Sequence, residues 1–154
     1  MKHLYGTYEH QLDDKNRIRI PAKFLSVFEK KYENEPLYFV IYTPGRIALM
    51  PESVLDERMG LLENILPDDE EAMDALSKIM GAAEEVNKDG QGRAIIPKGM
   101  RKEVGIDKDV VTVGMGDYLE IWAKEVRAER VDKMSRSEAN QKAYAKAREL
   151  ASKA

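Results

Sequence analysis

The sequence contains no cysteine and only two histidines, His3 and His10, which both lie near the N-terminus. The absence of cysteine excludes disulfide scaffolds, thiolate metal sites and cysteine nucleophiles, and it favours a reducing compartment. No apolar run approaches the roughly 18 residues that a membrane span needs, and the opening residues lack the apolar segment of a signal peptide. We therefore expect a cytoplasmic protein that does not engage a membrane.

The sequence also has little that points to catalysis. His3, Glu9 and His10 come nearest to a metal-ligand cluster, but their spacing matches no ligand pattern. Gly114 and Gly116 lack the third glycine and the following helix of a phosphate-binding loop, so they predict a hairpin turn instead. Because no nucleophile, base and orienting group occur together, we expect no enzyme, no catalytic residue, no cofactor and no bound metal.

Charge is distributed unevenly along the chain, although the net charge is only −3. Residues 1–31 carry seven Lys or Arg against four acidic residues, and residues 124–154 carry nine against five. Residues 63–85 carry eight acidic residues and a single lysine. Because salt limits the reach of each charge to about 8–10 Å, a basic face on this acidic chain can still bind phosphate.

An internal repeat is the most informative feature that is present. Residues 13–23 read DDKNRIRIPAK and residues 89–99 read DGQGRAIIPKG, with a shared frame of Asp, three residues, Arg, two residues, Ile and Pro. Matching apolar segments follow both copies, so the chain contains two units of about 45–50 residues each. The predicted organisation is as follows: a first unit over 4–52, a helical connection over 53–81, a second unit over 82–125 and a helical tail over 126–154.

Each unit predicts a strand, a turn, a second strand, a helix and a closing hairpin. Asn16 and Gly92 occupy the same place in the two turns, and both residue types tolerate a left-handed backbone, so positive φ is predicted at both. In the strand that follows the first turn, Ile18 and Ile20 alternate with Arg17 and Arg19, which lie on the opposite face. We therefore expect the two isoleucines in the core and the two arginines on the outside.

Helices are predicted between and after the two units. Residues 51–66 and 68–80 have helical character, and the carboxylates after Pro67 suit a helix N-terminus. After Lys124 the pattern predicts helix to the end of the chain, too polar to bury a full face. In the second unit Ile95, Ile96 and Trp122 are expected to be buried.

A cluster of basic residues makes the first turn and strand a candidate DNA-binding surface. A turn followed by a two-stranded ribbon fits the major groove, where arginine forks onto guanine or phosphate. The alternative is that these are ordinary solvated charges on an edge strand. The first copy holds four basic residues and the second only Arg93 and Lys98, so the first copy is predicted to dominate electrostatic binding. The candidate DNA-binding residues are Lys15, Asn16, Arg17, Arg19, Lys23 and Arg93.

Together these motifs resemble the MraZ family of bacterial transcriptional regulators. The family motif Asp-x-Lys-Gly-Arg, an apolar strand and Pro stands here as residues 13–21 and again as residues 89–97. A late Val-Gly-x-Gly-Asp turn leading to Glu-Ile-Trp stands as residues 113–122. Asn16 replaces the usual Gly in the first copy, and Gln91 takes the Lys place in the second.

The resemblance implies both a fold and a function. The fold is α+β, with tandem SpoVT/AbrB-like swapped-hairpin units that form one interleaved β-barrel with flanking helices. The function is transcription regulation of the division and cell-wall gene cluster, in the cytoplasm and associated with the nucleoid. The implied partners are double-stranded DNA with repeated boxes and further copies of the chain in a ring-shaped homo-oligomer.

Two other functions stay open at this point. The first is an AbrB-like antitoxin that represses its own operon and binds a toxin through its C-terminal helix. The second is a structural interaction barrel with no nucleic-acid role. Steep salt dependence of DNA binding separates DNA-binding proteins from the interaction barrel, and co-purification of a small toxic partner identifies the antitoxin.

Overall fold

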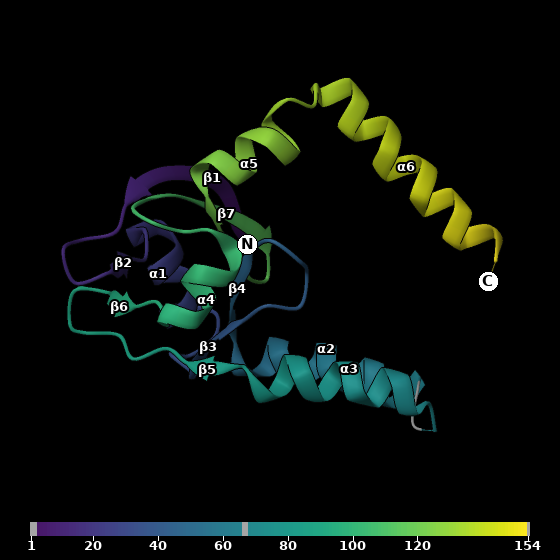
Figure 1. The fold of residues 1–154 in the computed structure, drawn as a ribbon, viewed down its shortest axis with the longest axis horizontal. Helices are drawn as coiled ribbons and strands as arrows, with labels where there is room; N and C mark the ends of the chain where they lie inside the picture. The colour runs from purple at the N-terminus through teal and green to yellow at the C-terminus, as the bar shows by residue number, and fades with distance from the viewer. Residues whose placement is uncertain (1–2, 66–67, 154) are drawn as a thin grey trace. The chain divides into compact units, whose positions relative to one another are not determined.

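The two sequence repeats give the same order of elements in a computed structural model, which describes residues 3–65 and 68–153. The first repeat contains β1 (Leu4–Gln11), β2 (Arg17–Arg19), α1 (Ala22–Lys30), β3 (Leu37–Val40) and β4 (Ile47–Pro51). The second contains β5 (Glu84–Glu85), β6 (Arg93–Ile95), α4 (Lys98–Val104), β7 (Asp109–Gly116) and β8 (Leu119–Ala123). Figure 1 shows these elements together with the helices that connect and follow them.

Strand pairing runs mostly between the repeats. A six-stranded antiparallel sheet has the order β1-β7-β8-β4-β3-β5, and β2 pairs with β6 in a separate two-stranded sheet. The hairpins β3–β4 and β7–β8 lie within one repeat each, but the pairs β1–β7, β3–β5, β4–β8 and β2–β6 each join one repeat to the other. The expected α+β class is confirmed: helices accompany a large antiparallel sheet.

The strands and helices around the turns follow the predicted pattern of burial. Ile18 and Ile20 are buried and Arg19 is exposed, as the alternation of residues 17–20 predicts. Pro21 precedes α1 with φ of −52°, a conformation that suits proline at a helix start. Phe24, Val27 and Phe28 then place one face of α1 in the core, at the spacing of an amphipathic helix.

The side chain of Trp122 lies at the centre of a polar cluster inside the core. Its Nε1 donates to Oε1 of Glu120 at 3.0 Å, and the guanidinium of Arg46 lies 4.0 Å from the centre of its ring. Arg46 also lies 3.5 Å from the other carboxylate oxygen of Glu120, which is 4% exposed. The buried carboxylate is thus paired and hydrogen-bonded, as a buried charge must be.

Trp122 and Ile96 are fully buried, as predicted, but the prediction for Ile95 is wrong. Ile95 is 60% exposed because the strand alternates, so that the buried neighbours Ala94 and Ile96 leave the residue between them on the outer face. Its counterpart in the first repeat is Arg19, which is also exposed. The apolar run at residues 94–96 concealed this alternation.

Two helices connect the repeats: α2 (Glu52–Ile65) and α3 (Glu70–Gly81). They lie side by side and extend away from the sheet (Figure 1). The predicted helix over 51–66 is observed in α2, while Leu66 and Pro67 lie outside the described residues. At the start of α3, the Asp69 side chain accepts a hydrogen bond from the backbone N–H of Ala72 at 3.0 Å, which supports the predicted acidic helix start.

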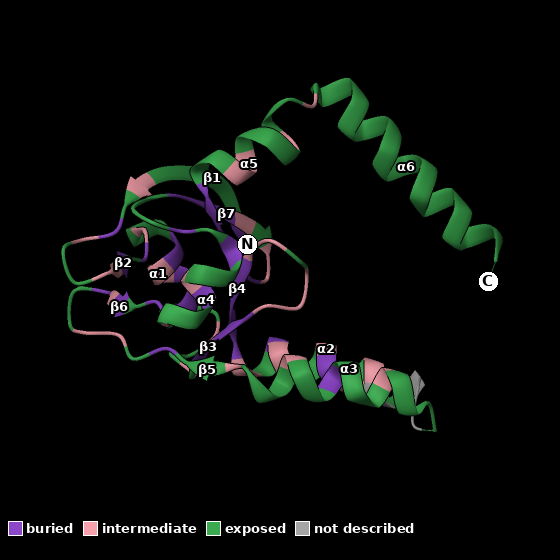
Figure 2. Cartoon of the chain, viewed as in Figure 1, coloured by how far each residue is buried: buried purple, intermediate pink, exposed green. Residues whose placement is uncertain are grey.

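The residues from Glu125 onward form a second compact unit, distinct from the unit that ends at Lys124. The helical segments here are α5 (Lys124–Arg127), a π-helical turn η1 (Ala128–Asp132) and α6 (Arg136–Ser152). The prediction of unbroken helix after Lys124 is therefore wrong at residues 133–135, where Ser135 caps a new helix through the N–H of Glu138. In α6 all described residues are exposed (Figure 2). Among the described helices, none has the length and apolar character of a membrane span.

Candidate nucleic-acid interface

The first turn is held by a single carboxylate. Asp13 accepts hydrogen bonds from the backbone N–H groups of Lys15 at 2.9 Å and Arg17 at 3.0 Å, and from Nε of Arg17 at 2.7 Å. The turn closes with a hydrogen bond from the N–H of Asn16 to the carbonyl of Asp13. Asn16 has φ of 60°, so the predicted left-handed conformation is confirmed. Asp13 therefore fixes both the backbone of the turn and the direction of the Arg17 side chain.

The second turn repeats this arrangement. Asp89 accepts from the backbone N–H groups of Gln91 at 2.8 Å and Arg93 at 3.0 Å, and from Nε of Arg93 at 2.8 Å. Gly92 has φ of 75°, as predicted. A Cβ at that position would also lie 2.8 Å from a methyl carbon of Leu25, so glycine suits this turn for both its backbone and its packing.

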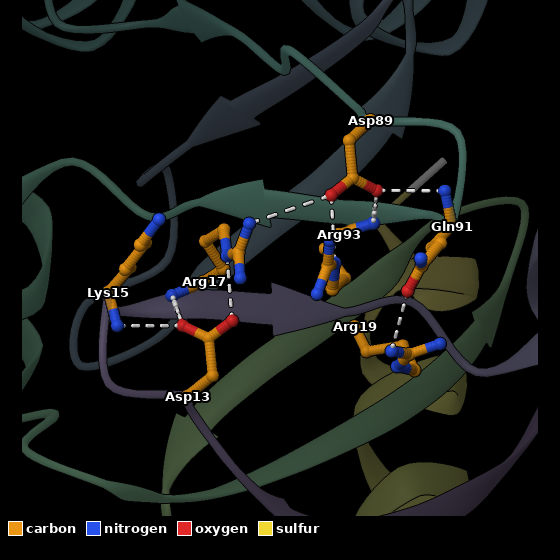
Figure 3. A network of polar contacts seen from close by, with 7 residues as sticks. All are labelled: Asp13, Lys15, Arg17, Arg19, Asp89, Gln91 and Arg93. Carbon is orange, nitrogen blue, oxygen red and sulfur yellow. Dashed lines mark hydrogen bonds and ion pairs between the residues drawn. The ribbon is translucent and has the colours of Figure 1, made fainter.

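The two turns stand next to each other because β2 and β6 are paired (Figure 3). The N–H of Ile20 donates to the carbonyl of Gly92 at 2.9 Å, and the N–H of Ile96 donates to the carbonyl of Asn16 at 3.3 Å. Register in the ribbon places Arg17 opposite Ile95 and Arg19 opposite Arg93. Each left-handed turn residue thus helps to position the strand end of the other repeat.

Side chains of the first repeat also reach across to the second turn. Nη1 of Arg17 lies 3.8 Å from Oδ2 of Asp89, and Nη2 of Arg19 donates to Oε1 of Gln91 at 3.3 Å (Figure 3). No equivalent contact from Arg93 to Asp13 occurs among the contacts of the described residues. The two turns are therefore alike in backbone and unequal in their side-chain contacts.

The electrostatics of the turns follow from these hydrogen bonds. The backbone N–H of Arg93, with further help from Gln91 and the Arg93 side chain, lowers the pKa of Asp89 to about 2. The backbone N–H of Arg17 likewise lowers the pKa of Asp13. Both carboxylates are therefore charged at neutral pH, and each balances the arginine that it orients.

The structure brings the predicted site residues together around this ribbon, with different exposure. Lys15, Arg19 and Lys23 are exposed, and Nζ of Lys23 lies 3.4 Å from the carbonyl of Tyr5. Asn16, Arg17 and Arg93 are only half-buried. Arg17 is predicted to lie outside the core, opposite Ile18 and Ile20; it lies on that face, and its Nε donates a hydrogen bond to Asp13.

The structural role of the two aspartates and the contact of Gln91 with Arg19 were not predicted from the sequence. The signal was present, because an Asp precedes each Arg by four residues in both copies. No cluster of three or more metal-ligating side chains occurs within residues 3–65 and 68–153. Of the two histidines, His10 lies with Nε2 at 2.7 Å from Oγ1 of Thr112 in the sheet.

Comparison with known proteins identifies relatives over most of the chain. The chain is 32% identical over 121 residues to the transcriptional regulator MraZ of Mycoplasmopsis pulmonis, covering 79% of each protein. It is 34% identical over 126 residues to the protein of that name from Caldanaerobacter subterraneus subsp. tengcongensis, covering 80% of this chain and 82% of the relative. The chain belongs to the MraZ family. A MraZ protein from Clostridium beijerinckii is also 34% identical, over 78% of this chain and 81% of that relative.

A family model described as "MraZ protein, putative antitoxin-like" matches residues 79–148. This match includes the second turn and most of α6, whereas the alignments to individual MraZ proteins extend over about four-fifths of the chain. The resemblance that the turn motifs indicated is therefore confirmed.

Proposed function

We propose that the chain is a transcription regulator that binds double-stranded DNA through the ribbon of β2 and β6 and its two turns. The single observation that carries this proposal is the pair of turns, each locked by an aspartate, set side by side with Lys15, Arg19 and Lys23 exposed around them. The MraZ relatives are named transcriptional regulators, which supports the same function. The finer site, comprising Lys15, Asn16, Arg17, Arg19, Lys23 and Arg93, belongs to this proposal.

The chemistry of the ribbon suits the major groove. A two-stranded ribbon has the width to enter that groove, and arginine can form two hydrogen bonds with guanine. In both turns the aspartate accepts a hydrogen bond from Nε of the arginine, so that the guanidinium is already oriented before DNA binds. This preorganisation reduces the side-chain entropy that is lost on binding. Exposed Lys15 and Lys23 would contact phosphates.

The strand pairing between repeats supports a finer reading of the fold. Because β1 pairs with β7 and β5 with β3, we interpret the two repeats as swapped-hairpin units that together form an interleaved barrel. We retain the proposed units over 4–52 and 82–125, the helical connection over 53–81 and the tail over 126–154.

The proposal includes an assembly, because one ribbon offers few contacts. A ring of several copies facing repeated DNA boxes would raise the overall affinity when the boxes match the spacing of the ribbons. The resemblance to the MraZ family implies that such boxes lie in the division and cell-wall gene cluster. It also implies a cytoplasmic protein associated with the nucleoid.

Capture of genomic fragments by the purified protein, followed by sequencing, tests the proposal and identifies the boxes. The fragments are then titrated with wild type, with the double variant Lys15→Ala/Arg19→Ala, and with Lys78→Ala/Lys142→Ala. The last pair removes the same charge from exposed positions on α3 and α6. We expect the ribbon variant to lose affinity and the control to keep it. Equal affinity in all three proteins would contradict the proposal.

A second candidate, the antitoxin, has one observation in its favour. The description of the matching family model includes antitoxin-like proteins, and α6 exposes Tyr144 and Leu150, at 58% and 70%. A small partner that co-purifies with the chain and is lost with a Tyr144→Ala/Leu150→Ala variant would support this function. The remaining alternative is an interaction barrel with no nucleic-acid role. It would be supported if the purified protein captured no genomic fragments and copies of the chain still assembled.

A further inference from the structure

Ile95 is an apolar side chain on a face that is otherwise formed by arginines. Successive residues of a strand point to opposite faces of the ribbon. The outer face therefore consists of Arg17 and Arg19 from β2 with Arg93 and Ile95 from β6. The inner pair, Ile18 and Ala94, is buried, at 1% exposure each. Ile95 therefore points away from the core, and it is 60% exposed.

The position of Ile95 within this face is well defined. It lies directly opposite Arg17 in the register, and the side chains of such a pair are about 5 Å apart at Cβ. Arg17 is held by Asp13, so the neighbour of Ile95 is a fixed guanidinium. In the first repeat the equivalent place is taken by Arg19, so the fold accepts a polar side chain there. Core packing does not explain the isoleucine.

In the major groove, thymine is the one base that presents a methyl group, and apolar side chains recognise it by contact. We propose that Ile95 is a specificity-determining residue that contacts the 5-methyl group of a thymine next to the base that Arg17 contacts. This inference rests on the proposed DNA-binding function. Exposed Arg19 and Lys15 supply the charge complementarity to duplex DNA, and Ile95 supplies a contact that depends on sequence.

The difference between the two repeats determines the orientation in which the ribbon would bind its DNA box. Arg19 and Ile95 are equivalent positions with different chemistry, so the two strands of the ribbon would prefer different bases. The strand that carries Arg19 would favour a hydrogen-bond acceptor or a phosphate. The strand that carries Ile95 would favour a methyl group, and the ribbon would therefore bind its box in one orientation.

Replacement of thymine by deoxyuridine tests the inference, because it removes only the methyl group. Captured box fragments are synthesised in both forms and titrated with wild type, Ile95→Ala, and Leu150→Ala as a control at an exposed leucine in α6. Loss of one buried methyl costs wild type and the control about fourfold in affinity. Ile95→Ala should bind the two forms equally and should bind the thymine form about fourfold less tightly than wild type.

Two outcomes would overturn the inference. One is a wild type that binds both DNA forms equally, which would leave strand propensity as the reason for isoleucine at this position. The other is an Ile95→Ala protein that retains the preference for thymine, because the methyl group would then be read elsewhere. Lys15→Ala/Arg19→Ala should weaken binding to both forms and keep their ratio. If wild type captures no DNA at all, the proposed function itself fails, and this result is distinct from equal binding to both forms.

Discussion

At the scale of single residues, Asp13 and Asp89 organise the candidate interface more than any basic residue does. Each accepts two backbone N–H groups and one guanidinium Nε, and together these fix the turn and aim the arginine. Removal of the Arg17 side chain would therefore break the Nε contact to Asp13 as well as a DNA contact, while the backbone hydrogen bonds of the turn remain. A binding defect in Arg17→Ala has two causes, and the aspartates offer a way to isolate the structural one.

The acid response of the protein should depend on Asp89. Its pKa in the folded protein is about 2, below the ordinary value of 3.8, so the charged form stabilises the fold above the ordinary pKa. That contribution is lost as the pH falls from about 4 to about 2. We expect the unfolding temperature of wild type to fall more steeply over this interval than that of Asp89→Asn, measured by thermal melts at successive pH values.

Asp107→Asn, at an exposed position outside both turns, serves as the matched control and should follow wild type. If Asp89→Asn lost stability with acid as steeply as wild type does, the lowered pKa would not be coupled to folding.

Ile95 and Ile96 provide a comparison between adjacent residues of the same type. Ile96 is fully buried, so Ile96→Ala should lower the free energy of unfolding by about 2–5 kcal/mol. Ile95→Ala should change it by less than about 0.5 kcal/mol, as is usual for surface substitutions. Chemical denaturation of both variants measures the difference. Similar losses at the two positions would mean that Ile95 is buried in the folded protein in solution, by an interface between copies.

At the scale of elements, α2 is attached to the sheet through a small polar and aromatic cluster. Nη2 of Arg58 donates to Oδ1 of Asp117 at 2.8 Å, and the guanidinium lies 4.8 Å from the centre of the Tyr118 ring. Val54 of α2 is buried in the same region, with Met50 and Tyr118. The apolar contacts hold the first turns of α2, and the arginine holds the helix to the turn between β7 and β8.

Removal of Arg58 should weaken this attachment by a modest amount. The ion pair is partly exposed and screened by solvent, so it contributes up to about 1 kcal/mol, with a similar amount from the cation–π contact. We expect Arg58→Ala to lower the free energy of unfolding by about 1 kcal/mol and to leave DNA affinity unchanged. A double-mutant cycle with Asp117→Ala isolates the ion pair. Full additivity of the two substitutions would show that the pair contributes nothing.

At the scale of the whole molecule, the two turns should contribute unequally to DNA binding. Lys15 and Arg19 of the first repeat are exposed, whereas Arg93 of the second is half-buried and tied to Asp89. Each phosphate contact contributes about 0.9 to the dependence of log affinity on log salt. Lys15→Ala/Arg19→Ala should lower this slope by up to about two units per subunit, and Arg93→Ala by one or less.

Salt titrations of both variants on the same fragment measure these slopes. A larger loss from Arg93→Ala than from the double variant would reverse the assignment of roles to the two repeats.

Much of the local structure could be predicted because its causes are local in sequence. The repeat of Asp, Arg and Pro at fixed spacing predicted the two turns, and Asn16 and Gly92 predicted their positive φ. The burial of Ile18 and Ile20 followed from alternation with arginines. In residues 94–96 all three side chains are apolar, so the same alternation was not visible within that segment; the repeat, which equates Ile95 with Arg19, carried the signal, and the pairing with Arg17 confirms the outward position.

Contacts between distant segments could not be predicted in the same way. The ion pair of Arg58 with Asp117 and the reach of Arg17 to Asp89 depend on which strands become neighbours. Composition does not determine that choice. Four of the five candidate basic residues lie in one segment of the sequence, residues 15–23, but the second turn beside them and the Asp89 and Gln91 contacts come from pairing between the repeats.

The pairing between repeats also has a consequence for how the protein is made. β1 begins at Leu4, and its partner β7 ends at Gly116, so the first strand leaves the ribosome long before the strand that completes it. At about 5–20 residues per second, the synthesis of some hundred residues takes about 5–20 seconds. During that interval the nascent first repeat has unpaired strand edges and uncovered apolar side chains such as Ile18 and Phe24. Binding by a ribosome-associated chaperone should therefore be strongest before residue 116 emerges, and it should end once the second repeat closes over the first.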